Sequence, residues 1–200
     1  MEAPEEVKNL VKKFEDNIER YKNPKYNETT VRQEFIDPLF IALGWDVNNI
    51  IKPKAPQYRD VILEDNIKVG GQTKSPDYCF TLSGNKIFFL EAKKPSVNII
   101  DDKAPAYQLK RYAWSAKFAL SVLTDFEDLA IYEAKTKPKN TDSTKVGRVK
   151  LYNYKDYVDK WDEIYNLLSK EAVETGSFDK FAGKKIKKGT SEVDDEFLKE

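Results

Sequence analysis

Histidine is absent from this chain of 200 residues, and cysteine occurs only once. The lack of histidine excludes Ser-His-Asp triads, Cys-His pairs, histidine-dependent nuclease sites and zinc sites built on imidazole. The single thiol, Cys79, lies in an apolar segment and has no partner for an intrachain disulfide. We therefore expect a buried free thiol, a reducing cytoplasmic location and no cysteine or serine nucleophile.

Long apolar runs and phosphate-binding loops are also missing. No apolar run approaches the ~18 residues of a membrane helix, so neither membrane spanning nor secretion is expected. No glycine-rich loop precedes a Lys-Ser or Lys-Thr pair, which excludes an ATPase motor in this segment. The 34 basic and 34 acidic residues cancel, so the chain lacks the overall positive field of a nonspecific DNA-coating protein. Any affinity for DNA is expected to be local.

Two apolar segments with a short turn between them carry the most informative pattern. The turn Ser83-Gly84-Asn85 separates residues 78–82 from residues 86–92, which predicts an antiparallel hairpin. The second segment contains the uninterrupted apolar run Ile87-Phe88-Phe89-Leu90, typical of a strand buried on both faces. Charged side chains at the end of such a strand are costly unless they are used.

Three charged residues lie at the ends of this hairpin. Asp77 begins the first strand, while Glu91 and Lys93 project to one face at the end of the second, because side chains alternate along a strand. Paired carboxylates suit Mg²⁺, or Mn²⁺ in its place, which can polarise a phosphoryl oxygen and activate water. Lys93 could orient the attacking water, accept its proton if the pKa is depressed, or neutralise the transition state; the sequence leaves these roles open. The alternative is a solvated Glu-Lys ion pair.

The segments Pro76-Asp77 and Glu91-Ala92-Lys93 give the chain a resemblance to the PD-(D/E)XK nuclease superfamily. The resemblance implies an α/β fold with a restriction-endonuclease-like core, in which a central mixed β-sheet is flanked by α-helices. It also implies Mg²⁺-dependent hydrolysis of DNA phosphodiesters, with Asp77 and Glu91 as metal ligands and Lys93 as the third catalytic residue.

A second motif lies on the helix expected at residues 104–117. Gln108 and Tyr112 are four residues apart and therefore share one helix face. They match a Gln-x-x-x-Tyr motif that follows the catalytic lysine in the nuclease domains of type I restriction motor subunits and type IIG restriction enzymes. The resemblance implies that both residues position the site or the DNA. The alternative is an amphipathic helix with Tyr112 packed on the sheet and Gln108 solvated.

Residues 29–43 are expected to form the opening helix of the same nuclease group. Thr29 or Thr30 would cap it and Gly44 would end it. In the family a glutamate of this helix often joins the metal shell, which makes Glu34 the fourth site candidate. The alternative is a surface glutamate held in helix ion pairs.

The pattern of apolar residues predicts the remaining helices and strands. A helix between the Glu-x-Lys strand and the next strand permits a crossover connection within a mixed sheet. Gly70-Gly71 would allow the backbone a close approach to a metal or phosphate, although a plain turn is the commoner role. Further helices are expected at 4–22 and 155–172, and strands at 118–124, 128–133 and 148–154. Candidate phosphate contacts are Lys52, Lys54, Arg59, Lys93, Lys94, Lys110 and Arg111.

The predicted organisation is a nuclease domain at residues 1–175, then a charged linker at 176–200 toward a missing methyltransferase region. The resemblance to type IIG enzymes implies double-stranded DNA as substrate, methyltransferase and target-recognition domains or subunits as partners, and S-adenosylmethionine only in the methyltransferase region. Each site would cut one strand, so a double-strand break needs sequential nicks or a transient nuclease-domain dimer. The alternatives are a type I motor subunit, a noncatalytic DNA-binding or assembly module with a nuclease fold, and a standalone repair or junction nuclease.

Overall fold

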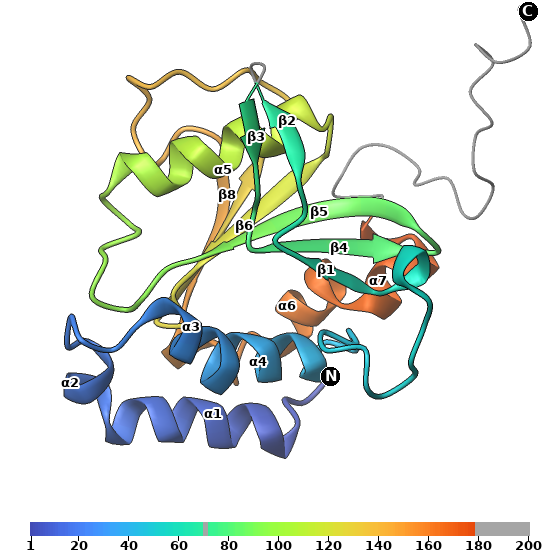
Figure 1. Ribbon diagram of the computed structural model, residues 1–200. Helices are drawn as coiled ribbons and strands as arrows, with labels where there is room; N and C mark the ends of the chain where they lie inside the picture. The colour runs from blue at the N-terminus through green and yellow to red at the C-terminus, as the bar shows by residue number, and fades with distance from the viewer. Residues whose placement is uncertain (70–71, 179–200) are drawn as a thin grey trace, which may run out of the picture.

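A mixed β-sheet forms the centre of the protein, in a computed structural model that describes residues 1–69 and 72–178 (Figure 1). The strand order is β1-β4-β5-β6-β7-β8. Only β5 and β6 are parallel, and helix α5 makes the crossover between them. The sheet strands are β1 (Val61–Leu63), β4 (Tyr78–Leu82), β5 (Asn85–Ala92), β6 (Leu120–Thr124), β7 (Asp128–Glu133) and β8 (Arg148–Asn153).

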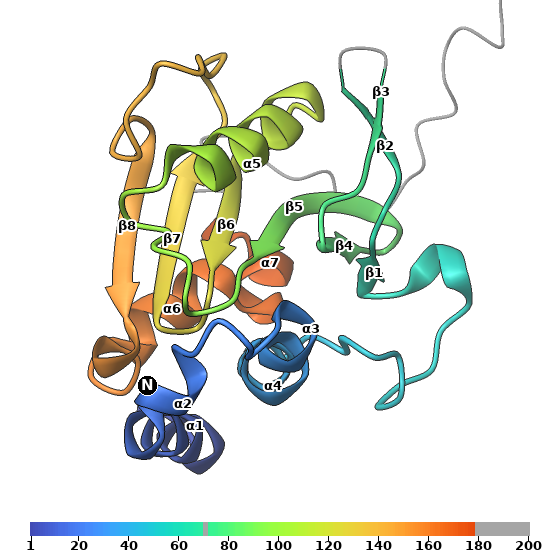
Figure 2. The ribbon, with the colours of Figure 1, turned by 60° about the vertical axis from the view of Figure 1, so that its left-hand side comes forward.

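Helices cover both faces of this sheet (Figures 1 and 2). A separate hairpin of β2 (Ile67–Val69) and β3 (Gln72–Lys74) lies beside α5. The expected role of Gly70-Gly71 lies outside the described residues. The helices are α1 (Glu5–Asp16), α2 (Ile18–Tyr21), α3 (Glu28–Val31), the π-helix η1 (Arg32–Ile36), α4 (Asp37–Ala42), the 3-10 helices η2 (Pro56–Tyr58) and η3 (Tyr154–Asp156), α5 (Lys103–Ser115), α6 (Trp161–Leu168) and α7 (Lys170–Thr175).

Two apolar cores lie on opposite faces of the sheet because β5 alternates its side chains between them. Phe88 and Leu90 belong to the larger core, which packs against the N-terminal helices, α6 and α7. Phe89 belongs to the smaller core, which includes Leu109 and Tyr112 of α5. Glu91 therefore points toward α5, on the same face as Phe89.

The predicted hairpin and crossover are confirmed, but three of the predicted helices are interrupted. The helix expected at 4–22 breaks at Asn17, where the backbone leaves the helical region (φ −134°, ψ 26°). The helix expected at 155–172 begins only at Trp161, after the 3-10 helix η3 and a turn, and it breaks at Ser169. Ser169 has an extended backbone, and its side-chain oxygen caps the next helix by accepting a hydrogen bond from the backbone N–H of Ala172.

The opening helix differs most from its prediction. Asn27, not Thr29 or Thr30, is its N-cap, accepting a hydrogen bond from the backbone N–H of Thr30 at 2.8 Å. The middle of the helix is the π-helical segment η1. An i→i+5 segment shifts the angular position of every residue after it, so the 3.6-residue periodicity no longer assigns the faces correctly.

Candidate metal and catalytic site

Asp77 and Glu91 lie opposite each other at one end of the β4–β5 hairpin. Tyr78 pairs with Leu90, so the next residue outward on each strand is Asp77 and Glu91. The backbone N–H of Ala92 donates to Asp77 Oδ2 at 2.8 Å and fixes that carboxylate against the strand end. The two carboxylates therefore converge, as the sequence pattern predicted.

Glu91 is the most enclosed charged group of the site, with 4% of its surface exposed. Its Oε1 accepts hydrogen bonds from Lys93 Nζ at 2.8 Å and from Gln108 Nε2 at 2.9 Å. Its Oε2 is buried and has no hydrogen-bond partner among the described residues. Burial and the nearby Asp77 carboxylate raise the pKa of Glu91 to about 6, against the opposing effect of Lys93.

The chemistry of these carboxylates fits a hard divalent cation. Buried polar atoms are normally satisfied, so the unpartnered Glu91 Oε2 suggests a ligand. Among the residues that the structure describes, the Oδ1 atom of Asp77 is held by Arg32 alone, at 3.3 Å. One oxygen on each carboxylate is thus free or weakly held, while the other is fixed by the protein. Such oxygens are the ligands that Mg²⁺ prefers, with water completing its coordination.

Lys93 lies between two carboxylates. Its Nζ is 2.8 Å from Glu91 Oε1 and 3.7 Å from Glu28 Oε2. Burial alone would lower the pKa of Lys93, but the carboxylates of Glu91, Glu28 and Asp77 outweigh it and raise the pKa above its usual value. Lys93 is therefore charged in this state, which does not match the role of a proton acceptor with a depressed pKa.

Glu28, not Glu34, is the acidic residue of the opening helix that contacts Lys93. The carboxylate of Glu34 pairs instead with Lys13 of α1, at 2.9 Å. Burial raises the pKa of Glu28, against the opposing charge of Lys93. The prediction that Glu34 joins the metal shell was therefore wrong, because its side chain lies against α1. The capping pattern at Asn27 was the available signal, because it places Glu28 at the start of the helix.

Gln108 of α5 contacts the site, and Tyr112 lies one turn further along the same helix. Gln108 is exposed, as the alternative interpretation expected, but its Nε2 also donates a hydrogen bond to Glu91 Oε1. Tyr112 is 5% exposed and packs in the smaller core, as that alternative expected. Burial and the Glu91 carboxylate raise the pKa of the Tyr112 phenol.

Arg32, at the start of η1, was not identified from the sequence as a site residue. Its Nη1 lies 3.3 Å from Asp77 Oδ1, and its Nε donates to the Tyr78 hydroxyl at 3.2 Å. The Tyr78 hydroxyl in turn donates to Asp37 Oδ1 at 2.6 Å. The guanidinium also lies over the Tyr78 ring, 4.7 Å from its centroid. A chain of contacts thus runs from Asp37 through Tyr78 and Arg32 to Asp77.

Several residues expected to contact phosphates are engaged within the protein. Lys110 is 5% exposed and donates to the carbonyl of Val146, so its prediction as a phosphate contact was wrong. Lys54 pairs with the buried Asp60 at 2.6 Å. Lys94 donates to the carbonyl of Pro24 at 3.0 Å. Lys52 and Arg59 are exposed.

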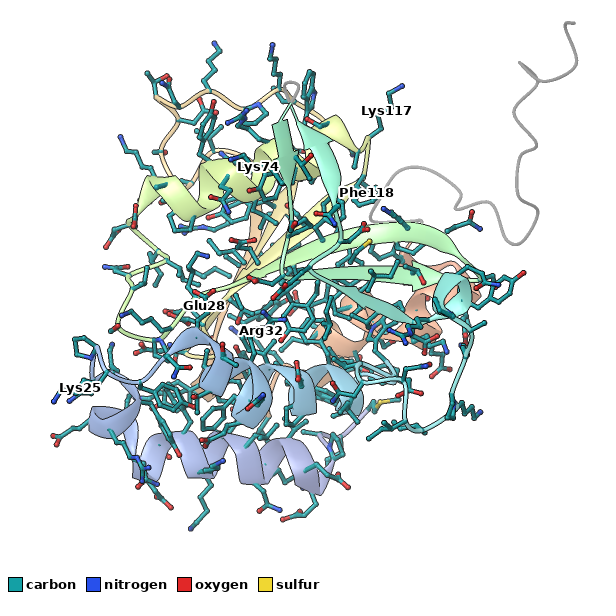
Figure 3. The ribbon with its side chains drawn as sticks, viewed as in Figure 1. Lys25, Glu28, Arg32, Lys74, Lys117 and Phe118 are labelled. Carbon is teal, nitrogen blue, oxygen red and sulfur yellow. The ribbon has the colours of Figure 1, made fainter. Side chains whose placement is uncertain are left out.

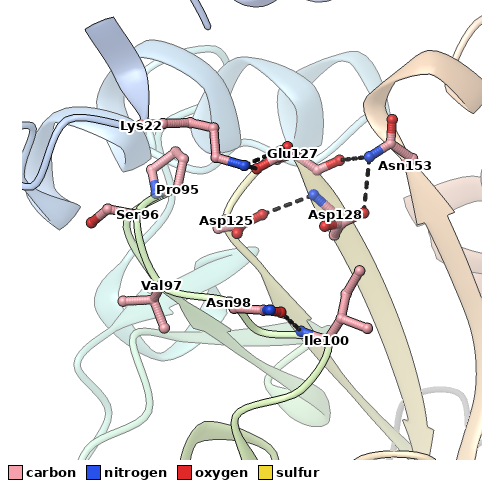
Figure 4. A pocket seen from close by; sticks show the side chains of 10 residues that line it. All are labelled: Lys22, Pro95, Ser96, Val97, Asn98, Ile100, Asp125, Glu127, Asp128 and Asn153. Carbon is pink, nitrogen blue, oxygen red and sulfur yellow. Dashed lines mark hydrogen bonds and ion pairs between the residues drawn. The ribbon is translucent and has the colours of Figure 1, made fainter. Parts of the chain in front are cut away.

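A second acidic group lies in the turn between β6 and β7 and lines a pocket of about 330 Å³ (Figure 4). Lys22 pairs with Glu127, and Asn153 donates to Asp128 Oδ1. Asp125 Oδ1 accepts a hydrogen bond from the backbone N–H of Asp128. These contacts account for the three carboxylates as parts of a turn.

Comparison with known proteins gives a family match over residues 25–140, to the N terminus of type I restriction enzyme R proteins. The chain belongs to this family. Residues 25–140 run from the turn before α3 to beyond β7, and so include Glu28, Arg32, Asp77, Glu91 and Lys93. The match does not itself assign a role to any of them.

Two relatives of this R-protein N-terminal domain are informative. The chain is 43% identical to the type II restriction enzyme and methyltransferase RM.Eco57I of Escherichia coli, covering all of this chain and 20% of that protein. It therefore spans about a fifth of the length of this relative. A solved chain of the cryo-EM DrdV–DNA complex aligns with 82% of this chain and 94% of its own, at 18% identity and a TM-score of 0.50. That likeness confirms the α/β restriction-endonuclease-like fold. No helix in the described residues is long and apolar enough to span a bilayer.

Proposed function

We propose that this chain is the Mg²⁺-dependent DNA endonuclease domain of a restriction-modification enzyme, of the PD-(D/E)XK superfamily and most similar to the type IIG group. The observation that carries the proposal is the buried, unpartnered Oε2 of Glu91 opposite Asp77, with the charged Lys93 on the other Glu91 oxygen. The family match and the restriction-enzyme relative support the same conclusion.

Asp77 and Glu91 would hold the metal ion, whose contribution is to polarise a phosphoryl oxygen and lower the pKa of a bound water. Ala92 and Gln108 each donate a hydrogen bond to one oxygen of the two carboxylates, which leaves the second oxygen of each for the metal ion. Lys93 supplies a fixed positive charge, which stabilises negative charge that develops on the phosphate. Glu28 shares Lys93 with Glu91 and helps to keep it protonated.

The whole enzyme would contain more than this domain. A methyltransferase region that uses S-adenosylmethionine, and a target-recognition region, would lie outside this chain, as the name of the relative suggests for the first of them. The linker expected at 176–200 lies almost entirely outside the described residues. Because one site cuts one strand, a double-strand break would use sequential nicks or a second nuclease domain.

Plasmid nicking tests the proposal directly. With Mg²⁺ or Mn²⁺, the wild-type chain is expected to convert supercoiled plasmid to nicked circles, and EDTA should abolish the conversion. Asp77→Asn should slow nicking at least about a hundredfold, since even partners outside the first coordination shell cost 10–100-fold. Asp159→Asn, on an exposed carboxylate without an ion pair among the described residues, should match the wild type.

Two other outcomes would change the assignment. A wild-type chain that binds DNA but does not nick it with either metal would favour the noncatalytic assembly module. Strong preference for branched over linear DNA would favour a standalone repair or junction nuclease.

We also propose that the turn after α2 contacts the DNA backbone. Arg20, Asn23, Lys25 and Tyr26 line a pocket of about 300 Å³, and neither cation makes an ion pair in the described part of the chain. The bond from Lys94 to the carbonyl of Pro24 joins this turn to the segment directly after Lys93. Lys25 and Glu28 accordingly lie on the same side of the molecule in Figure 3.

The salt dependence of DNA binding tests this contact. The double variant Arg20→Ala/Lys25→Ala is expected to weaken binding and to reduce the slope of log K against log salt by up to about 2, at about 0.9 per phosphate contact. Lys117→Ala is the control, because Lys117 is exposed and lies at the opposite end of the molecule in Figure 3. An equal slope in all three proteins would contradict the contact.

A further inference from the structure

Arg32 is the only cation that contacts Asp77 within the described residues, and it does so on the oxygen that a metal ion would need. Asp77 Oδ2 is already taken by the backbone N–H of Ala92, which leaves Oδ1 for Arg32. The side chains of both residues are 16% exposed, so their charges are only partly screened by water. A metal ion and Arg32 therefore compete for one carboxylate oxygen.

Arg32 also has contacts that do not depend on Asp77. Its Nε donates to the Tyr78 hydroxyl, whose own proton goes to Asp37 Oδ1 at 2.6 Å. The guanidinium stacks on the Tyr78 ring at 4.7 Å. These contacts would keep the Arg32 side chain in place if Asp77 were taken by another cation, and Nη1 would then be free to donate elsewhere.

Building on the function proposed above, we propose that Arg32 is an exchangeable positive charge. In the metal-free protein it neutralises Asp77; when a divalent cation binds Asp77, Arg32 releases the carboxylate and binds the phosphodiester of DNA. The planar guanidinium suits both tasks, because it matches the geometry of carboxylates and phosphates alike. The exposed Glu64, 3.9 Å from Arg32 Nη1, makes a long and solvated contact that does not hold it.

Repulsion between a metal ion and Arg32 supports this exchange. Arg32 lies 3.3 Å from the Asp77 oxygen that a metal ion would take. A divalent ion on Asp77 would therefore stand beside the guanidinium and repel it, unless an anion entered between them. The phosphate of DNA is such an anion, and Arg32 is the cation already beside the ligand that the metal takes over.

The first measurement is Mn²⁺ binding by calorimetry, with folding checked by circular dichroism. Arg32→Met removes the charge and keeps most of the apolar stem, so it should bind Mn²⁺ about 3- to 10-fold more tightly than the wild type, because the competing cation is gone. Arg32→Gln should change in the same direction and serves if Arg32→Met does not fold. Arg59→Met controls for net charge, since Arg59 is exposed and has no ion pair among the described residues; its affinity should stay within about twofold.

The second measurement separates charge exchange from simple repulsion of the metal. Binding of a short fluorescent duplex is followed with and without Ca²⁺, and gels check that the DNA stays intact. Arg32→Met should lower the affinity about tenfold with Ca²⁺ and less than about twofold without it, because Arg32 is engaged by Asp77 only in the metal-free protein.

Three results would overturn the proposal. Unchanged or weaker Mn²⁺ binding in the folded Arg32 variants would make Arg32 a clamp that preorganises Asp77. An equal loss of DNA affinity with and without Ca²⁺ would make it a permanent phosphate contact. No Mn²⁺ binding by the wild type would overturn the proposed nuclease function itself, and this inference with it.

Discussion

Glu91→Gln is expected to abolish DNA cleavage and at the same time to stabilise the fold. The amide keeps the shape of the side chain and can still accept the hydrogen bond from Gln108, but it replaces the unpartnered Oε2 by an uncharged group. Loss of a charged ligand should reduce plasmid nicking at least about a hundredfold. Glu133→Gln is the matched control, because Glu133 is only partly buried and has no ion pair within the described ranges; it should nick at the wild-type rate.

The stability gain follows from the raised pKa of Glu91, about 6 in the folded protein against 4.5 ordinarily. Below pH 4.5 both states hold the proton, so ionisation makes no contribution. As the pH rises from 4.5 to 6 the unfolded chain loses the proton first, and stability falls. Above pH 6 the full penalty remains, about 2 kcal/mol at 1.36 kcal/mol per pKa unit. In metal-free urea unfolding, Glu91→Gln should therefore be about 2 kcal/mol more stable than the wild type at pH 8, and equal to it at pH 4. Equal stability at both pH values would contradict the buried charge.

Trp45→Ala is expected to be the most destabilising single change in the opening segment. Trp45 is fully buried and packs edge-on against Phe80 and Phe88, with ring centroids 5.0 and 6.0 Å away. Its Nε1 donates to the carbonyl of Leu168 at 2.9 Å, at the end of α6. Truncation to alanine should cost about 3–5 kcal/mol for the lost packing, and the buried carbonyl left without its partner adds to this. The residue joins the end of α4 to the sheet and to the C-terminal helices.

Urea unfolding monitored by far-ultraviolet circular dichroism measures this effect. Trp45→Phe keeps an aromatic ring but leaves the Leu168 carbonyl unpaired, so it should fall between the wild type and Trp45→Ala. Trp114→Ala is the control, because Trp114 is 38% exposed on α5 and its cation-π contact with Lys137 is at the surface; it should cost less than about 1 kcal/mol. Equal losses at Trp45 and Trp114 would mean that the opening segment is not held in this way.

The central hairpin could be predicted from sequence because its determinants are local. A turn at Ser83-Gly84 is enough to predict the hairpin, and alternation at the end of β5 places Glu91 and Lys93 on one face. The pairing of Asp77 with Glu91 also needs a register shift between Phe80 and Thr81, because the register at the turn alone would set Asp77 opposite Leu90. The following crossover to β6 is equally local, since a helix must separate two parallel strands. These features also carry the family motifs, which is why the resemblance was informative.

The opening helix could not be predicted as accurately as the hairpin. Its middle is π-helical, which shifts the faces of the residues that follow. The family resemblance selected Glu34 from this helix, whereas the structure brings Glu28 to Lys93 and Arg32 to Asp77, both from positions before or at the start of the π-helical segment. No pattern in the sequence indicated that Arg32 belongs to the site, because its partners Tyr78 and Asp77 lie more than 40 residues away in the chain.

Contacts between segments that are distant in the sequence explain the remaining differences. Lys110 looked like a surface lysine of α5, but its amine is engaged by the carbonyl of Val146 in the loop before β8. The break at Ser169 depends on a contact with the opening segment, where the N–H of Lys170 donates to the carbonyl of Leu43. Neither partner can be inferred from the local sequence.

Calorimetric titration of the purified chain with Mn²⁺, beside Glu91→Gln, tests the central claim most directly. Manganese takes the same hard oxygen ligands as Mg²⁺ and generally binds protein sites more readily. If Asp77 and Glu91 form a metal site, the wild type binds Mn²⁺ at pH 8, more weakly below about pH 6 where Glu91 is protonated, and Glu91→Gln does not bind it at this site. Equal binding by both proteins, or no binding by the folded wild type, would contradict a metal site at the end of the hairpin.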